Sequence, residues 1–155
     1  MTGTLTIRDA TDADLAAVAA LYESSGIDAP GQHDTATLGA AWQRLRRDAP
    51  TARVLVAEEG GRPVGTLTCF VLPLLIHGGT PAALVEAVAV DRAAQGRGIG
   101  RALMDAAMAI AREAGCYKLA LSSNARRHEA HAFYDRLGYA RHGVSFVAEP
   151  REIPA

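Results

Sequence analysis

Three glycines alternate with other residues in the segment AAQGRGIGRALM, which runs from Ala93 to Met104. The preceding run ALVEAVAV is apolar and β-branched, as expected of a buried strand, and the Ala-rich segment that follows has helical periodicity. Amides at the start of a helix, bare glycine backbone and nearby arginines together favour binding of an anion, most often a phosphate. The loop therefore predicts a phosphate site with Arg92, Arg97 and Arg101 around it.

Two common phosphate-binding loops do not fit this segment. A Walker-type loop needs a lysine and a hydroxyl residue directly after its last glycine, whereas Arg101 and Ala102 follow Gly100. A dinucleotide-binding loop needs G-x-G-x-x-G, but the sixth position counted from Gly96 is Arg101. The acidic ribose contact of that loop, about 20 positions further on, would fall near Cys116 inside the next predicted strand.

The segment satisfies a third pattern, Gln/Arg-x-x-Gly-x-Gly/Ala, through Gln95, Gly98 and Gly100. With this pattern the chain resembles the GNAT superfamily of acyl-CoA-dependent N-acetyltransferases. A second motif, HEAHAFYDRLGYA from His128 to Ala140, is similar to the family's A-x-x-F-Y-x-x-x-G-F segment, with Tyr139 where phenylalanine is common. The two motifs and the elements between them carry the resemblance.

The resemblance implies that the glycine loop holds the pyrophosphate of acetyl-CoA, and that amides of the preceding strand hold its pantetheine arm and acetyl carbonyl. A helix N-terminus has the right polarity for the pyrophosphate. The implied coenzyme-binding residues are Val88, Ala89, Val90, Gln95, Gly96, Arg97, Gly98, Ile99, Gly100, Arg101, Asn124 and Tyr134. Asn124 lies ten residues before Tyr134 rather than the more common seven, which leaves open whether it contacts the ligand or only belongs to a helix-capping loop.

The resemblance also implies that Tyr134 is the general acid that protonates the departing thiolate of coenzyme A. A phenol with a pKa near 10 is a reasonable proton donor to a thiolate whose pKa lies slightly lower. The alternative is a core tyrosine that packs beside Phe133.

Glu86 is an acidic residue within an apolar predicted strand, and burial of an unpaired carboxylate is costly. Aminolysis of a thioester requires a neutral amine, so a base must remove a proton at pH 7. Glu86 resembles the general base that several family members carry on this strand. The alternative is a glutamate that faces outward and pairs with an arginine.

Length and charge agree with one globular enzyme domain. The 155 residues with 49% hydrophobic and 21% charged residues suit a single domain over 1–155 with a loose tail EPREIPA. A net charge of −1 gives no electrostatic reason to expect nucleic acid or a membrane surface as partner.

Neither a signal sequence nor a membrane span is evident, so we expect a cytoplasmic protein. Cys69 and Cys116 have no cysteine or histidine at metal-ligand spacing, and we therefore expect no metal. Both cysteines are expected as buried free thiols, with a disulfide left open.

Hydrophobic periodicity and turn residues predict an α/β (mixed α+β) fold, in which a central twisted mixed sheet is flanked by helices in the GNAT manner. The order of the elements mixes hairpin-type and crossover connections, which indicates mixed strand directions. The predicted strands span 5–8, 52–59, 63–76, 81–90, 116–122 and 139–148, and the predicted helices span 12–25, 35–48, 99–114 and 125–137.

The acceptor amine is the least constrained part of the prediction. His33 and Asp34, in the loop between the first two helices, are candidates for the acceptor side. The apolar stretch VLPLLIHGGTPAA could cover a hydrophobic acceptor or form a homodimer interface. Without an evident acidic patch, a small-molecule amine is favoured over a protein tail. A non-catalytic acyl-CoA-binding module is the alternative function, which the presence of both Glu86 and Tyr134 disfavours.

Overall fold

The computed structural model describes residues 3–150 of the chain, so most of the predicted tail lies outside the described residues. The chain divides into two compact parts, which among the described residues are 3–121 and 122–150. The first part holds a sheet and most of the helices, and the second part holds one helix and an irregular segment.

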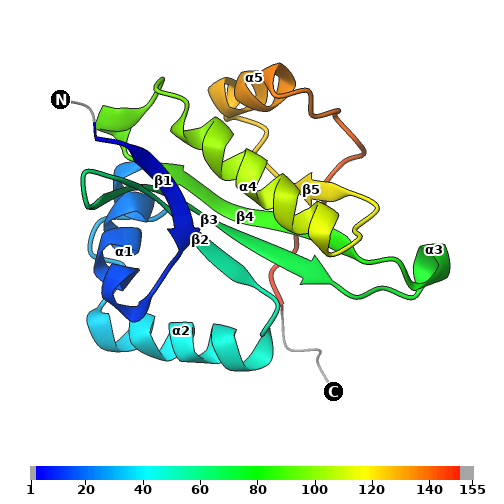
Figure 1. The fold of residues 1–155 in the computed structure, drawn as a ribbon, viewed down its shortest axis with the longest axis horizontal. Helices are drawn as coiled ribbons and strands as arrows, with labels where there is room; N and C mark the ends of the chain where they lie inside the picture. Colours follow the sequence, from blue (N-terminus) through cyan, green and yellow to red (C-terminus); the bar gives the residue numbers. More distant parts are fainter. Residues whose placement is uncertain (1–2, 151–155) are drawn as a thin grey trace. The chain divides into compact units, whose positions relative to one another are not determined.

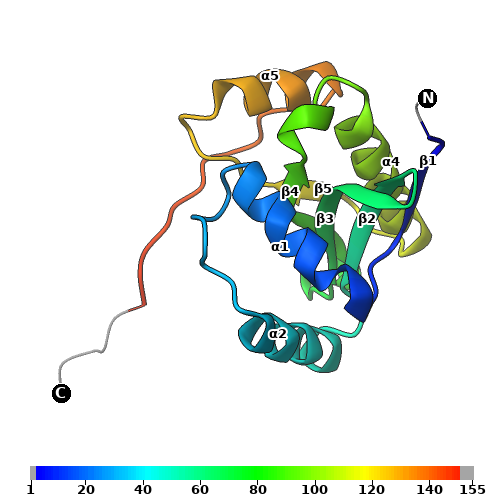
Figure 2. The same cartoon turned by 90° about the vertical axis from the view of Figure 1, so that its left-hand side faces the viewer.

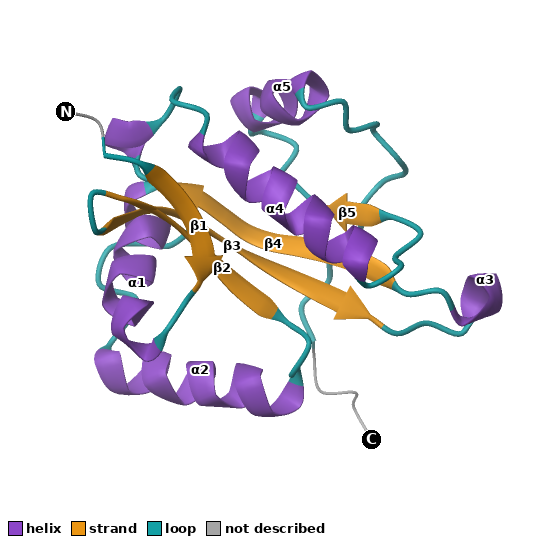
Figure 3. Ribbon diagram, viewed as in Figure 1, coloured by secondary structure: helices purple, strands orange, loops and turns teal. Residues whose placement is uncertain are grey.

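The sheet has five strands in the order β1-β2-β3-β4-β5 (Figures 1 and 3). The first three pairings are antiparallel and the β4–β5 pairing is parallel, which confirms the predicted mixed sheet. The strands are β1 (Leu5–Asp9), β2 (Arg53–Glu59), β3 (Arg62–Leu72), β4 (Ala82–Val90) and β5 (Leu119–Leu121). The helices are η1 (Asp12–Asp14), α1 (Leu15–Ser24), α2 (Thr35–Asp48), α3 (Ile76–Gly79), η2 (Arg92–Ala94), α4 (Ile99–Glu113) and, in the second part, α5 (His128–Arg136).

Helix α4 packs on one face of the sheet through an apolar stripe. The stripe consists of Ile99, Leu103, Met104, Ala107, Ile110 and Ala111, all buried, and it confirms the helical periodicity predicted for this segment. The approach to β3 is close at Gly65, where an added Cβ would lie 2.9 Å from Cγ2 of Ile99 and 3.3 Å from the carbonyl oxygen of Ala89. Gly65 is therefore required by packing rather than by a turn.

Helix α1 lies on the opposite face of the sheet (Figure 2). Successive residues of a strand alternate between faces, so Thr68, three positions after Gly65, points to the face opposite α4. Its side chain interacts with the Tyr22 hydroxyl of α1. Helices α1 and α4 thus cover opposite faces of the sheet. The candidate site described below includes residues on the α1 face near Thr68.

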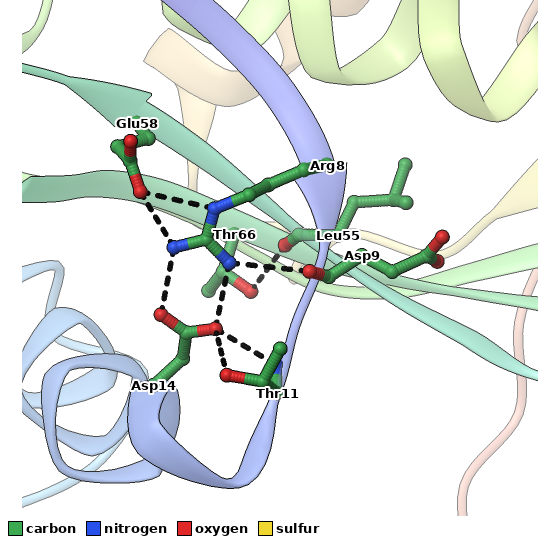
Figure 4. A network of polar contacts seen from close by, with 7 residues as sticks. All are labelled: Arg8, Asp9, Thr11, Asp14, Leu55, Glu58 and Thr66. Atoms are coloured by element: carbon green, nitrogen blue, oxygen red, sulfur yellow. Dashed lines mark hydrogen bonds and ion pairs between the residues drawn. The ribbon is translucent and has the colours of Figure 1, made fainter. Parts of the chain in front are cut away.

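A polar network fixes the start of α1 against β1 and β2 (Figure 4). The Arg8 guanidinium donates to both carboxylate oxygens of Asp14 at 2.7 and 2.9 Å, and also to Glu58 at 2.6 and 3.0 Å. The backbone N–H and hydroxyl of Thr11 donate to the same Asp14 carboxylate at 2.7 and 3.1 Å. The buried carboxylate therefore caps the first turn and joins it to the sheet edge.

The predicted strand over 139–148 is wrong. Residues 139–150 form no strand, and Val144, Phe146 and Val147 are 80%, 94% and 100% exposed. The alternation of apolar side chains is present, but a strand also needs a neighbouring edge for its backbone hydrogen bonds. No ladder involves this segment in the described residues.

Two other strands are shorter than predicted. Strand β3 ends at Leu72, because Pro73 has no N–H to donate to a ladder, and Ile76 starts the short helix α3 instead. Strand β5 is confined to three residues rather than 116–122. No helix of residues 3–150 is both long and apolar enough to cross a membrane.

Candidate functional site

A β-bulge interrupts β4 at the strand positions predicted to hold the pantetheine arm. Thr68 pairs with Glu86 and Thr66 pairs with Ala89, so two residues of β4, Ala87 and Val88, stand opposite one residue of β3. Ala87 adopts a φ of 54°, in the left-handed region that a residue with a Cβ rarely adopts. A bulge leaves backbone groups unpaired in the ladder and often lies beside a functional site.

The other side of β4 is also open from Glu86 onward. Strand β5 pairs only with Ala83, Leu84 and Val85. Within residues 3–121, no strand therefore covers that edge of β4 from Glu86 to Val90. Exposed strand amides of this kind can hydrogen-bond an extended, amide-containing ligand in the manner of an additional strand.

The glycine loop joins the end of β4 to α4 and leaves the start of that helix uncapped. Gly96 and Gly98 have φ of 77° and 81°, a left-handed conformation that glycine adopts without strain. Gly98 is the N-cap of α4, and no side chain caps the helix. The first helical hydrogen bond runs from the Ala102 N–H to the Gly98 carbonyl, so the amides of residues 99–101 have no partner within the helix.

The arginines around the loop differ in their availability. Arg97 Nη2 pairs with the Glu59 carboxylate at 2.5 Å. Arg92 and Arg101 are exposed and have no ion pair among residues 3–150. Two free guanidinium groups and the positive end of α4 therefore favour binding of an anion at this end of the sheet. Arg97 can contact a phosphate only if its ion pair with Glu59 breaks.

Glu86 lies next to the bulge, exposed and without a partner. The described part of the chain gives its carboxylate no hydrogen bond and no ion pair, so the alternative of a glutamate neutralised by an arginine does not occur there. Opposite residues of an antiparallel pair share a face of the sheet, and Glu86 is opposite Thr68. The carboxylate therefore belongs to the α1 face, available as a base.

The two cysteines are free thiols, as predicted, and no disulfide joins them. Cys69 is buried in β3 and Cys116 is half-buried before β5. Burial raises the pKa of both thiols, which keeps them protonated and poorly nucleophilic at neutral pH. A covalent intermediate on either cysteine is therefore disfavoured.

Tyr134 lies on α5 in the second part of the chain. Its ring contacts Phe133 edge-on, with centroids 5.0 Å apart, and Tyr139 at 6.1 Å. Burial raises the pKa of the Tyr134 phenol, and the Arg127 charge only partly offsets this effect. The hydroxyl is thus protonated at neutral pH, as a proton donor must be. The ring packing also fits the alternative of a structural tyrosine.

Asn124 has a local structural role in the loop before α5. Its Oδ1 accepts a hydrogen bond from the Arg126 N–H at 3.0 Å, and its carbonyl accepts from Arg127 N–H and contacts His131 Nε2, both at 2.9 Å. These contacts lie within the loop that leads into α5, whose N-cap is Arg127 and which no side chain caps. The Asn124 Nδ2 group donates to no atom among residues 3–150 and stays available to a ligand.

The structure also places the two residues proposed for the acceptor side. Asp34 is the N-cap of α2, and its carboxylate accepts a hydrogen bond from the Thr37 N–H at 2.9 Å. The carboxylate therefore has a structural role at the start of this helix. His33 pairs with Asp28 instead of facing solvent alone. The sequence pattern missed Asp28, because five residues of irregular loop separate it from its partner. It also missed the bulge, since alanine carries no signal for a left-handed φ.

A hollow of about 770 Å³ lies away from these residues. It is lined by the end of β1, the start of β2 and α2, including Asp12, Trp42 and Arg46, and it contains no predicted site residue. Among residues 3–150, no group of three or more His, Cys, Asp or Glu side chains could hold a metal ion.

A family model described as the acetyltransferase (GNAT) family matches residues 16–139. A solved structure of a putative acetyltransferase from Agrobacterium tumefaciens superposes with a TM-score of 0.86 at 30% identity, covering 94% of this chain and 99% of that one. An aminoglycoside N(6')-acetyltransferase type 1 of Stenotrophomonas maltophilia is 34% identical over 136 residues, which are 86% of this chain and 85% of that protein.

A glucosamine 6-phosphate N-acetyltransferase of Trypanosoma brucei brucei is 33% identical over 97 residues, 63% of this chain. A probable glucosamine 6-phosphate N-acetyltransferase 2 of rice, Oryza sativa subsp. japonica, is 37% identical over 98 residues, 61% of this chain. The matched regions span 64% and 57% of those two relatives, less than two thirds of their length.

Proposed function

The chain belongs to the acetyltransferase (GNAT) family, and from this premise we propose that it transfers the acetyl group of acetyl-CoA to a primary amine of a small molecule. The main support for the proposal is the order of three features along residues 86–101, in the first part of the chain. An unpaired carboxylate, a strand with open amides and an uncapped helix N-terminus follow one another from Glu86 to Arg101.

Each part of this stretch fits one part of acetyl-CoA. The free amides at the start of α4, with Arg92 and Arg101, suit the pyrophosphate. The open amides of β4 between Glu86 and Val90 suit the amide groups of the pantetheine arm and the acetyl carbonyl oxygen. When bound, acetyl-CoA would supply an acetyl group activated by a thiolate leaving group.

In this proposal one side chain acts as the general base of the reaction and another acts as the general acid. Glu86 takes a proton from the amine, directly or through water, as the bond between the amine nitrogen and the acetyl carbon forms. Tyr134 gives its hydroxyl proton to the sulfur as the carbon–sulfur bond breaks. Solvent then returns a proton from Glu86 to Tyr134, so the products are an N-acetyl amide and coenzyme A. Direct attack by the amine agrees with the absence of an activated cysteine.

The named relatives suggest the class of acceptor. One is named for aminoglycosides and two for glucosamine 6-phosphate. Compounds of both kinds present a primary amine on a sugar ring. We therefore propose an amino-sugar amine as the acceptor.

Acetyl-CoA binding is the first test. At about 100 times its Kd, a ligand specific for the folded state adds about 2.7 kcal/mol of stability, so the Tm should rise with acetyl-CoA and stay constant with NADH or ATP. Release of free thiol in the presence of an amine then distinguishes the enzyme from a non-catalytic acyl-CoA-binding module. A Tm shift from NADH or ATP but none from acetyl-CoA would refute the proposal.

A pair of glycine variants localises the binding. Gly98→Ala puts a side chain on the left-handed N-cap of α4, and Gly115→Ala puts one on a left-handed residue with open space past the end of the same helix. Both should lose about 1 kcal/mol of stability. Only Gly98→Ala should weaken acetyl-CoA binding, because only that residue lies where the phosphate approaches the backbone. Equal affinities of the two variants would contradict this placement.

A homodimer is a further part of the proposal. Leu75 and Ile76, in the connection between β3 and β4, are 98% and 57% exposed, which supports contact with a second copy. Sedimentation equilibrium of the wild type and of Leu75→Ser tests it, and a monomeric wild type at micromolar concentration would contradict it.

A further inference from the structure

The loop after α1 presents a fixed histidine–aspartate pair. The N–H groups of Ile27 and Asp28 both donate to the Tyr22 carbonyl, at 3.0 and 3.1 Å, which folds the loop back onto the last turn of the helix. Nε2 of His33 lies 2.5 Å from Oδ2 of Asp28, and the two side chains are only 21% and 22% exposed. The His33 ring also lies against Tyr22, with centroids 6.2 Å apart. The pair is therefore held in place rather than free in solvent.

This pair borders the same sheet face as Glu86. Helix α1 packs against β3 and β4, where Tyr22 interacts with the side chain of Thr68, and Thr68 is directly opposite Glu86 across β3 and β4. Directly opposite side chains on an antiparallel pair begin about 5 Å apart. A chain of neighbours thus leads from Glu86 through Thr68 and Tyr22 to His33, all within the first part of the chain. An acceptor with its amine at Glu86 would extend along this line.

The chemistry of the pair favours hydrogen-bond donors. Because Nε2 faces a carboxylate, the neutral ring is assigned the tautomer with its proton on Nε2, which leaves a lone pair on Nδ1. That nitrogen and the Asp28 carboxylate accept hydrogen bonds from an ammonium or hydroxyl group. The segment between Arg8 and Arg44 contains no lysine or arginine. Residues 9–43, which include the pair, therefore supply no cationic side chain that would pair with a phosphate.

Resting on the proposed function, we propose that Asp28 and His33 form a second acceptor-binding position of the transferase. It takes an ammonium or hydroxyl group distant from the amine that is acetylated. The acceptor class that fits is a polyamine-type amino sugar, cationic and without phosphate. Glu86 and Asp28 then both attract the same cation, one at the reacting amine and one at its far end.

Calorimetry with kanamycin, in the presence and absence of coenzyme A, tests this position without requiring turnover. His33→Gln and Asp28→Asn each remove a hydrogen bond to a charged group and should weaken kanamycin binding about tenfold. Asp105→Asn is the matched control, since it removes an exposed carboxylate on α4 that has no partner among residues 3–150, and should bind as the wild type does. The wild type should also bind glucosamine more tightly than glucosamine 6-phosphate.

Kinetics separate binding from chemistry. In the two loop variants the KM for kanamycin should rise about tenfold, while kcat and the KM for acetyl-CoA stay within about threefold. Unchanged kanamycin binding in both variants, a fall in kcat alone, or preference for the phosphorylated sugar would overturn the inference. Failure of acetyl-CoA to shift the Tm would instead refute the proposed function, whatever the outcome of the amine calorimetry.

Discussion

The Arg8–Asp14 pair makes the stability of the protein depend on pH in a way that one substitution isolates. Asp14 is buried, and hydrogen bonds from Arg8 together with those from Thr11 lower its pKa from 3.8 to about 2 (Figure 4). A carboxyl with a lowered pKa stabilises the folded state above its unfolded pKa, and this contribution is lost as pH falls toward the folded pKa. The relevant window is therefore pH 5 to 2.

The size of the effect follows from the shift. A change of one pKa unit corresponds to about 1.4 kcal/mol, so the shift of Asp14 represents at most roughly 2.4 kcal/mol. Arg8 is 35% exposed, and solvent screening reduces the contribution to about 1–2 kcal/mol. Asp14→Asn should lose this amount at pH 6, and about half of the difference from the wild type should be gone by pH 3.

Urea unfolding of the wild type, Asp14→Asn and Asp48→Asn between pH 6 and pH 3 measures this difference. Asp48 is an exposed carboxylate at the end of α2, outside the network, so its substitution controls for the lost charge. Other carboxyl groups titrate in the wild type and in both variants and cancel in the comparison. A stability gap for Asp14→Asn that stays constant with pH, or a matching gap for Asp48→Asn, would refute the reasoning.

Three further outcomes are expected. Tyr134→Phe should lower kcat at least tenfold while the Kd for acetyl-CoA changes little, since it removes a proton donor; equal losses in both, measured by thiol release and calorimetry, would assign the ring a packing role. Glu59→Gln should tighten acetyl-CoA binding several-fold at low salt, because it releases Arg97 from its ion pair; an unchanged Kd would show that Arg97 makes no phosphate contact. Gly65→Ala should destabilise the fold by about 1–3 kcal/mol in urea unfolding, since its Cβ would press on Ile99; a neutral effect would mean that α4 shifts freely.

The amino-acid sequence determined the features that depend on neighbours along the chain. The buried stripe of α4 follows from helical spacing, and the loop before that helix follows from glycines at positions of left-handed φ. The α2 boundaries were predicted to the residue, because Pro50 and the polar ends act locally. Both motifs that carry the family resemblance lie in such local elements, so the family could be predicted before any fold was known.

Tertiary structure alone decided the features that depend on distant pairings. Arg8 meets Glu58 only because β1 pairs with β2, and Arg97 meets Glu59 only because the glycine loop comes close to the last residue of β2. The bulge at Ala87 depends on the register between β3 and β4, and the failure of the 139–148 strand depends on the lack of a partner edge. Hydrophobic periodicity indicates which side chains of one element can be buried together. The register and pairing of strands depend instead on which strands and helices pack together in the folded protein.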